Sequence, residues 1–333
     1  MKTGEKNLIT DVQGLRVGHA QDNKIKTGTS VILCDTPSVA AVQVLGGGPG
    51  TRETDLLEPH NTVERVHAIC LSGGSAFGLD AAGGVQSYLR GLSIGFEVGE
   101  HHIPIVPSAI LFDLINGGHK DWGLHSPYRE LGYQAASGAS HQFALGSVGA
   151  GLGALTANKR GGLGSASSVL DNGLTIGALV AANPMGSVNI AQTQHFWAAP
   201  FELDNEFGGL GYPHPMPDDA TDLQIKFREM QRGGANTTIA VIATDAELTK
   251  AEAKRLAISA HDGFARAIWP CHTSYDGDLV FALSTGTSGR KPTPDEYIDL
   301  CAAASSTMAR AIARGIYSAT AQAGDLLPAW NAQ

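Results

Sequence analysis

The sequence predicts a mixed α/β fold in which strands and helices alternate. Residues 237–333 contain, in order, a strand, a helix, a second strand and a second helix. In the first half, the apolar run 66–71 leads through a glycine-rich turn into a helical pattern. With 43% hydrophobic and 17% charged residues among 333, the chain can bury a sizeable core. The length alone is compatible with one large domain or with two.

Apolar and β-branched patterns predict several strands before residue 183. These strands are expected at residues 15–17, 30–34, 39–45, 66–71 and 174–182. Ser75 is predicted to cap a helix that runs from residue 76 to about residue 89. Residues 108–115 are short and mostly apolar, and the small side chains of residues 143–158 predict either a helix or a tightly packed segment.

Two helices after residue 237 have clear start signals. Each begins with Thr and Glu three positions apart, which is the spacing of a capping box, and the second also has Pro294 at its first helical position. The helices are expected at about 249–268 and 293–317, and strands at 237–245 and 279–284.

Composition and motif spacing argue against several classes of function. The net charge of −9 provides no basic surface for nucleic acid. The 12 histidines lack metal-ligand spacing, and neither a P-loop nor a dinucleotide fingerprint occurs, so no metal or organic cofactor is expected. The four cysteines form no CxxC pair, and no uncharged apolar run reaches the ~18 residues of a membrane helix. These features predict a cytoplasmic protein with reduced thiols.

The most informative segment is the sequence Gly-Gly-Ala-Asn-Thr-Thr at residues 233–238, directly before an alternating β-branched run. A hydroxyl residue behind an Asn peptide bond at a strand start suits a self-cleaving N-terminal-nucleophile enzyme. The Thr237 hydroxyl would attack the Asn236 carbonyl, and the released Thr237 α-amine would then serve as the base for its own hydroxyl. The local pattern by itself is also that of an ordinary polar turn.

Three further groups of residues are candidates for the site. Asp276 and Asp278 flank one glycine, so in an extended chain both carboxylates point to the same side, where they can hold an ammonium group and a hydroxyl. An ordinary Asp-Gly turn is the alternative. The glycine-rich stretches 73–78 and 162–167 are predicted to be turns whose backbone N–H groups can frame an oxyanion. Lys159 and Arg160 form a cationic pair in an apolar, glycine-rich stretch.

Residues 187–235 lack regular periodicity, apart from a possible short helix near residues 221–230. Long irregular segments are usually functional or disordered. Because this one lies directly before the suspected cleavage point, we expect a mobile tail at about residues 187–236 after the cut.

Eight ordered motifs resemble the L-aminopeptidase/D-esterase family of self-processing hydrolases, which includes β-peptidyl aminopeptidases and 6-aminohexanoate-oligomer hydrolases. The motifs are LGGGPGTRETDLLEP (45–59), ICLSGGSAFGLDAAGGV (69–85), VPSAILFDLINGG (106–118), GAGLGA (149–154), KRGGLGSAS (159–167), VAANPMGSV (180–188), NTTIAVIATD (236–245) and HTSYDGDLVFAL (272–283). The resemblance implies a four-layer αββα sandwich formed by residues 1–333 as a single domain, cut into fragments 1–236 and 237–333.

The resemblance also implies roles for individual residues. Thr237 would be the nucleophile, Asn236 the new C-terminus and Asn183 the oxyanion-binding side chain. Asp276 and Asp278 would surround the nucleophile and its amine. Lys159 matches a family lysine near the active site, with Arg160 as the alternative. Phe112, together with Gly73, Gly74 and Ser75, is expected to contact substrate. Phe112 stands where the nylon-oligomer enzyme has a tyrosine, which argues against that substrate. A threonine nucleophile is typical of the same enzyme, so the two residues point to different substrates and do not identify one.

The function predicted from these residues is a cofactor-free amide hydrolase acting on small peptides, β-peptides or ω-amino-acid oligomers through an acyl-enzyme. An acyltransferase of the ornithine acetyltransferase type is the alternative, and a non-catalytic relative is a third. The partners expected are the chain's own cleaved fragment and further copies in a homotetramer of heterodimers, with neither nucleic acid nor membrane.

Overall fold

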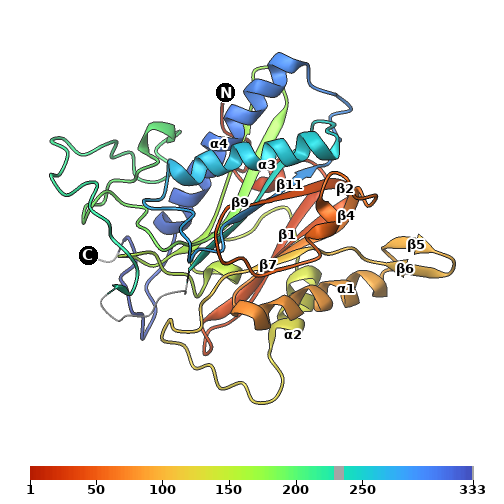
Figure 1. Cartoon of the computed structure of the whole chain (residues 1–333), viewed down its shortest axis with the longest axis horizontal. Coiled ribbons are helices and arrows are strands. Elements are labelled where there is room, and N and C mark those ends of the chain that lie inside the picture. The colour runs from red at the N-terminus through yellow and green to blue at the C-terminus, as the bar shows by residue number, and fades with distance from the viewer. Residues whose placement is uncertain (229–235, 332–333) are drawn as a thin grey trace.

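The computed structural model describes residues 1–228 and 236–331 (Figure 1). In these residues the strands are β1 (Leu15–Asp22), β2 (Thr27–Val44), β3 (Thr51–Arg52), β4 (Arg65–Ser72), β5 (Phe96–Val98), β6 (His101–Ile103), β7 (Ser108–Ile110), β8 (Gly162–Val169), β9 (Thr175–Asn183), β10 (Thr237–Thr244) and β11 (Leu279–Ser284). The α-helices are α1 (Ala81–Gly91), α2 (Tyr128–Ser137), α3 (Lys250–Ala265) and α4 (Pro294–Tyr317).

The long strand β2 joins two groups of strands. The hydrogen-bonded order is β3-β7-β4-β2-β11-β10-β9-β8, and β1 also pairs with β2. The first part of β2 pairs with β1 and β4, and its last part pairs with β11. The separate strands predicted at 30–34 and 39–45 are therefore wrong. The exposed residues 35–37 have the composition of a turn, but they accompany a register shift against β4 inside one continuous strand.

Three hydrophobic cores separate four layers, because alternate side chains of a strand face opposite sides. In Figure 1, α3 and α4 lie on one side of the strands and α1 and α2 on the other. The first core packs β8–β11 on α3 and α4, and includes Val180, Ile242 and Ile312. The second lies between the strand layers, and the third packs Val31 and Cys70 on α1 and α2. The predicted αββα sandwich is confirmed.

The part of the chain from residue 237 onward follows its prediction closely. Strand β11 and helix α4 have the expected bounds, and the two capping boxes are formed. The Thr249 and Thr293 side chains accept hydrogen bonds from the backbone N–H groups of Glu252 and Glu296. Local sequence signals therefore suffice for these helix starts.

Several predictions before residue 187 are wrong. Residues 162–167 lie in strand β8 rather than in a turn, because their glycines serve close packing. Ser75 has a left-handed backbone (φ 53°) and does not cap a helix; a 3₁₀ turn, Ser75–Asp80, precedes α1. Residues 143–158 form the tightly packed alternative, irregular apart from the 3₁₀ turn Gly149–Gly151. Helix α2 was not predicted.

Residues 187–228 are irregular, as expected, but they are packed on the fold. Val188, Phe196 and Phe207 are buried in the core beside α3 and α4. The short helix predicted near 221–230 is absent from residues 221–227, which form turns and irregular chain. Residue 228 lies in a 3₁₀ turn, and residues 229 and 230 lie outside the described part. The mobility of this segment after a cut stays a prediction.

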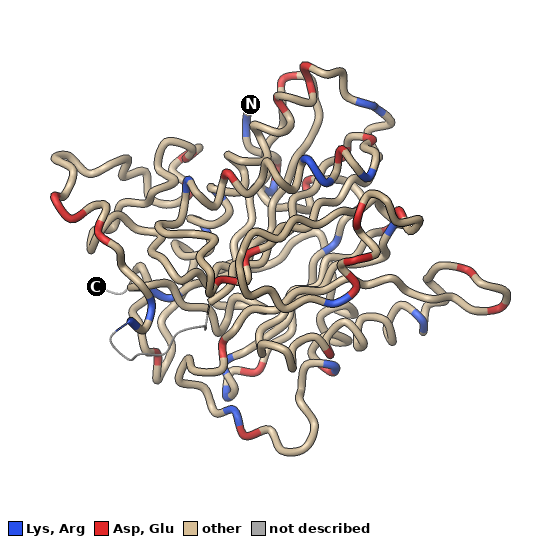
Figure 2. The backbone as a smooth tube through the Cα atoms, in the orientation of Figure 1, with Lys and Arg blue, Asp and Glu red and all other residues tan. Residues whose placement is uncertain are grey.

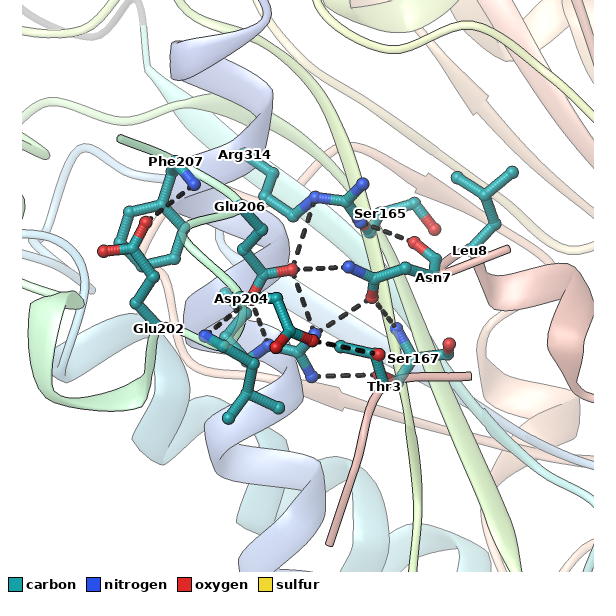
Figure 3. A network of polar contacts seen from close by, with 12 residues as sticks. Thr3, Asn7, Leu8, Ser165, Ser167, Glu202, Asp204, Glu206, Phe207 and Arg314 are labelled. Atoms are coloured by element: carbon teal, nitrogen blue, oxygen red, sulfur yellow. Dashed lines mark hydrogen bonds and ion pairs between the residues drawn. The ribbon is translucent and has the colours of Figure 1, made fainter. Parts of the chain in front are cut away.

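An ionic network ties this segment to α4 and to the N-terminal segment (Figure 3). Glu206 accepts hydrogen bonds from two nitrogens of the Arg310 guanidinium group and from the Asn7 side-chain amide. Arg314 lies 3.5 Å from the same carboxylate and also donates to the carbonyl oxygens of Asn7 and Ser165. Since the Arg310 side chain is fully buried, its charge depends on Glu206 for compensation.

A glycine in β8 permits the close approach of α4. A Cβ atom at Gly164 would lie 1.8 Å from the carbonyl oxygen of Ala311. We expect Gly164→Ala to force the strand and helix apart and to lower the free energy of unfolding by about 1–3 kcal/mol. Urea denaturation measures the change. Gly91→Ala is the control, since nothing lies within 4 Å of its new Cβ, and equal loss in both variants would contradict the packing argument.

The charged residues show no segregation by sign along the fold. Figure 2 shows Lys and Arg interspersed with Asp and Glu over the traced backbone. None of the helices described has the length and hydropathy of a transmembrane segment.

Candidate active site

Thr237 begins strand β10 in the middle of the sheet. Strand alternation puts it on the same face as Ile239 and Val241, which lie in the core between the two strand layers. Its side chain is buried, and its Oγ1 donates a hydrogen bond to the carbonyl oxygen of Asn236. The hydroxyl therefore lies against the peptide group that links Asn236 to Thr237. The glycines 233 and 234 of the same motif lie outside the described residues.

The Asn236 carbonyl has a second hydrogen-bond donor. The backbone N–H of Gly277 lies 3.2 Å from the Asn236 oxygen, and Asn236 forms a parallel bridge with Asp276. A backbone donor at this place polarises the carbonyl and stabilises negative charge that develops on its oxygen.

Both aspartates predicted for the site are buried beside Thr237, where they accept hydrogen bonds from backbone N–H groups. Asp278 accepts hydrogen bonds from the Thr238 N–H at 2.7 Å and from the His272 N–H at 3.0 Å. Asp276 accepts from the Met185 N–H at 3.1 Å and from the N–H and hydroxyl of Thr273. Burial, followed by the charge of Asp278, raises the pKa of Asp276. Both carboxylates are thus buried rather than solvated, and their role around the nucleophile stays a prediction.

A pair of histidines extends the hydrogen bonds of Asp278. His272 Nδ1 lies 2.9 Å from the second oxygen of Asp278, and His272 Nε2 lies 3.2 Å from His261 Nδ1. His261 Nε2 contacts the carbonyl oxygen of Gln43 at 3.0 Å. Burial lowers the pKa of His261 to about 4, so this ring is neutral at pH 7. The spacing of residues in the sequence does not predict this series of hydrogen bonds, because its members come from three separate segments.

Asn183 pairs directly with Thr237 across β9 and β10, so the two side chains share a face. Its Oδ1 accepts from the Leu155 N–H at 3.0 Å and from the Lys226 ammonium at 2.9 Å, and its Nδ2 donates to the Phe112 carbonyl at 3.0 Å. The amide thus lies beside Thr237, with its NH₂ group directed to the Phe112 carbonyl.

The lysine that reaches Asn183 is Lys226 rather than Lys159. Among the described contacts, those of Lys159 belong to its backbone, which bonds Thr156, and none joins its side chain to Thr237 or Asn183. Arg160 is buried and pairs with Asp325. An active-site role for Lys159 stays a prediction. Lys226 was missed because it stands in an irregular segment with no motif around it.

The predicted substrate-binding residues surround a buried carboxylate. The Gly74 N–H donates to Asp113 at 2.8 Å, and the Ser75 N–H bonds the carbonyl of Leu111. A Cβ at Gly73 would lie 2.2 Å from the Asp113 carboxylate, so this turn needs glycine. Phe112 and Asp113 line a small cavity together with Asn183, Lys226 and Phe227. Burial raises the pKa of Asp113.

No three His, Cys, Asp or Glu side chains in the described residues converge as they would around a metal ion. The polar groups that the described contacts bring together here are the buried Thr237 hydroxyl, the Asn236 carbonyl and the carboxylates of Asp276 and Asp278.

Two solved structures share the fold of this chain. The β-aminopeptidase of a Burkholderia species superposes with a TM-score of 0.71 at 24% identity, covering 98% of this chain and 92% of that chain. The L-aminopeptidase D-Ala-esterase/amidase of Ochrobactrum anthropi, described as a new variant of the Ntn hydrolase fold, gives 0.67 at 20% identity, with 95% and 87% covered. The chain therefore has an Ntn-hydrolase fold.

Sequence comparisons supply the family. Residues 7–326 match the model of peptidase family S58. An uncharacterized aminopeptidase of Mycobacterium tuberculosis is 40% identical over 336 residues, 96% of each chain. The 6-aminohexanoate-oligomer endohydrolase of a Kocuria species is 28% identical over 299 residues, 88% of this chain and 79% of that protein. The chain belongs to peptidase family S58 and is a hydrolase of amide bonds, which confirms the predicted resemblance.

Proposed function

We propose that this amide hydrolase matures by cutting its own chain between Asn236 and Thr237. Thr237 Oγ1 attacks the Asn236 carbonyl carbon and loses its proton to a base in the site. The tetrahedral intermediate collapses as the Thr237 nitrogen takes up a proton and leaves, so that an ester joins Asn236 to Oγ1. Water then hydrolyses the ester, which leaves a carboxylate on Asn236 and a free α-amine on Thr237.

The observation that carries this proposal is the contact of the Thr237 hydroxyl with the Asn236 carbonyl, at a strand start where the Gly277 N–H bonds the same oxygen. The attacking hydroxyl and an oxyanion donor thus both contact the carbonyl of the same peptide bond before any substrate binds. Burial of Thr237 keeps both groups in fixed geometry.

In the cut enzyme the same hydroxyl would attack a substrate amide, with the Thr237 α-amine accepting its proton. The substrate amine takes that proton and leaves, and water then releases the acyl group from Oγ1. We propose Asn183 as an oxyanion donor, since its NH₂ group lies on the face of Thr237. Asp278 is proposed to orient the new ammonium group, because it already bonds the next N–H along the chain.

The substrate class that we propose is short peptides and aminoacyl amides. The mycobacterial relative, which matches the chain along nearly its whole length, is named an aminopeptidase. The oligomer endohydrolase is less similar, and Phe112 offers no hydroxyl group to a substrate.

We expect purified protein to contain two fragments, residues 1–236 and 237–333, of about 25 and 10 kDa by their share of the 34.6 kDa chain. Intact mass spectrometry measures both, and N-terminal sequencing of the small one should read Thr-Thr-Ile-Ala. Active enzyme that remains uncut would overturn the mechanism. Product analysis with added amine acceptors then tests hydrolysis against acyl transfer.

A further inference from the structure

A buried lysine contacts the site from the segment before the proposed cut. The Lys226 side chain is 3% exposed, and its ammonium donates to the carbonyl oxygens of Leu155 at 2.8 Å and Asn183 at 3.2 Å. Its third contact is the Asn183 side-chain oxygen at 2.9 Å. The Lys226 N–H also donates to the Met185 carbonyl at 2.9 Å. All three ammonium hydrogens thus have acceptors, and the backbone is held as well.

The charge of this lysine is balanced by the carboxylates of the site. Burial lowers the pKa of Lys226 to about 7, while the nearby charges of Asp276 and Asp278 raise it. Three oxygen acceptors around one nitrogen favour the protonated form, because a neutral amine has only two hydrogens to donate.

These contacts determine how the Asn183 amide is turned. Two donors, the Lys226 ammonium and the Leu155 N–H, meet one end of the amide, so that end must be oxygen. The NH₂ group is consequently fixed at the opposite end, toward Phe112. Without the ammonium, one of the two donors that select this orientation is lost.

We propose that Lys226 is a positioning residue of the active site, which fixes the Asn183 amide with its NH₂ group available as a hydrogen-bond donor for the reaction. The inference rests on the proposed function. Lys226 lies only ten positions before Asn236. A residue close to the cleaved bond in the sequence thus also completes the site that cleaves it. Lys226 and Phe227 line the small cavity beside Phe112 and Asn183, which places these two residues in the wall of the site in the uncut chain.

Lys226→Met tests the proposal, because it removes the ammonium and keeps an unbranched side chain. We expect the cleavage of freshly made precursor to slow by about 10–100-fold, because a reacting group misplaced by about 1 Å can cost about 10²-fold in rate. After prolonged incubation, the cut variant should show a reduced kcat with little change in KM on aminoacyl p-nitroanilides. Intact mass spectrometry against time gives the first quantity, and steady-state kinetics gives the second.

A second buried lysine provides the matched control. Lys250 donates to the carbonyl oxygens of Leu56, Asn61 and Val63 at 2.8–3.0 Å, at the start of α3 and outside the candidate site. Lys250→Met should lower stability and leave the cleavage rate within about twofold of the wild type. Equal slowing in both lysine variants, or no slowing in Lys226→Met, would overturn the proposal.

A double-mutant cycle separates positioning from a general structural role. If Lys226 acts through Asn183, Lys226→Met should add little to the slowing caused by Asn183→Ala. If the slowing in the double variant instead equals the product of the two single-variant factors, Lys226 does not act through Asn183. Lys226→Leu, which also lacks a side-chain donor, repeats the cycle if the methionine variant is insoluble, with the same outcomes. Wild-type protein that never cuts would instead overturn the proposed function itself, so the two failures are distinguishable.

Discussion

Thr237→Ala is expected to leave the chain intact at 34.6 kDa and without measurable amidase activity. The substitution removes Oγ1, which contacts the Asn236 carbonyl and which is the proposed nucleophile of both reactions. The loss should reach at least about 10⁴-fold, as for removal of other covalent nucleophiles. Mass spectrometry and p-nitroanilide hydrolysis measure the two effects.

Thr237→Ser is the matched variant, since it keeps a hydroxyl on the same backbone and should retain part of the cleavage. Thr238→Ala provides a further control at the next position, where the side chain faces the other side of β10. Hydrolysis by uncut Thr237→Ala would mean that another residue is the nucleophile.

Gly277→Ala is expected to slow self-cleavage by about 100-fold or more. A Cβ atom at this position would lie 2.7 Å from Thr237 Oγ1 and 2.8 Å from the Gly48 carbonyl oxygen. The loop must then move, and the Gly277 N–H loses its contact with the Asn236 carbonyl; removal of one oxyanion donor costs about 10²–10³ in rate. The rate at which the small fragment forms is the measurement.

Gly48→Ala is the control for that variant. Its Cβ would lie 3.8 Å from the Asp276 carbonyl oxygen, which is an ordinary contact. The Gly48 N–H would keep its bond to Asp276. We expect cleavage close to the wild-type rate, and a normal rate in Gly277→Ala would show that the contact with Asn236 has no part in the reaction.

The fold and the position of Thr237 at a strand start could be predicted because their signals are local or carried by family motifs. The capping boxes of α3 and α4 involve residues three positions apart. The start of β10 at Thr237 is marked by the alternating β-branched run that begins there. The glycines of β8 misled the prediction, because Gly164 is needed for contact with a helix about 150 positions later and not for a turn.

The rest of the site depends on contacts that no local pattern specifies. Lys226 reaches Asn183 from an irregular segment, where neither period nor motif predicts which side chain turns inward. His261 and His272 meet only after α3 and the following loop have packed together. The role of Gly277 was missed because it is exerted by a backbone N–H, which every residue except proline carries.

The ionic network around Glu206 has a consequence for how the protein refolds. Glu206 and Asn7 belong to the fragment before the proposed cut, and Arg310 and Arg314 belong to the fragment after it. Strands β9 and β10 also pair across the same boundary. Precursor denatured and then diluted from urea folds as a single chain, at a rate independent of concentration. Once cut, the fragments must first find each other, so recovery becomes second order and slows in proportion to dilution. A single bond cleavage would thereby convert a unimolecular folding reaction into one that depends on retaining the partner fragment.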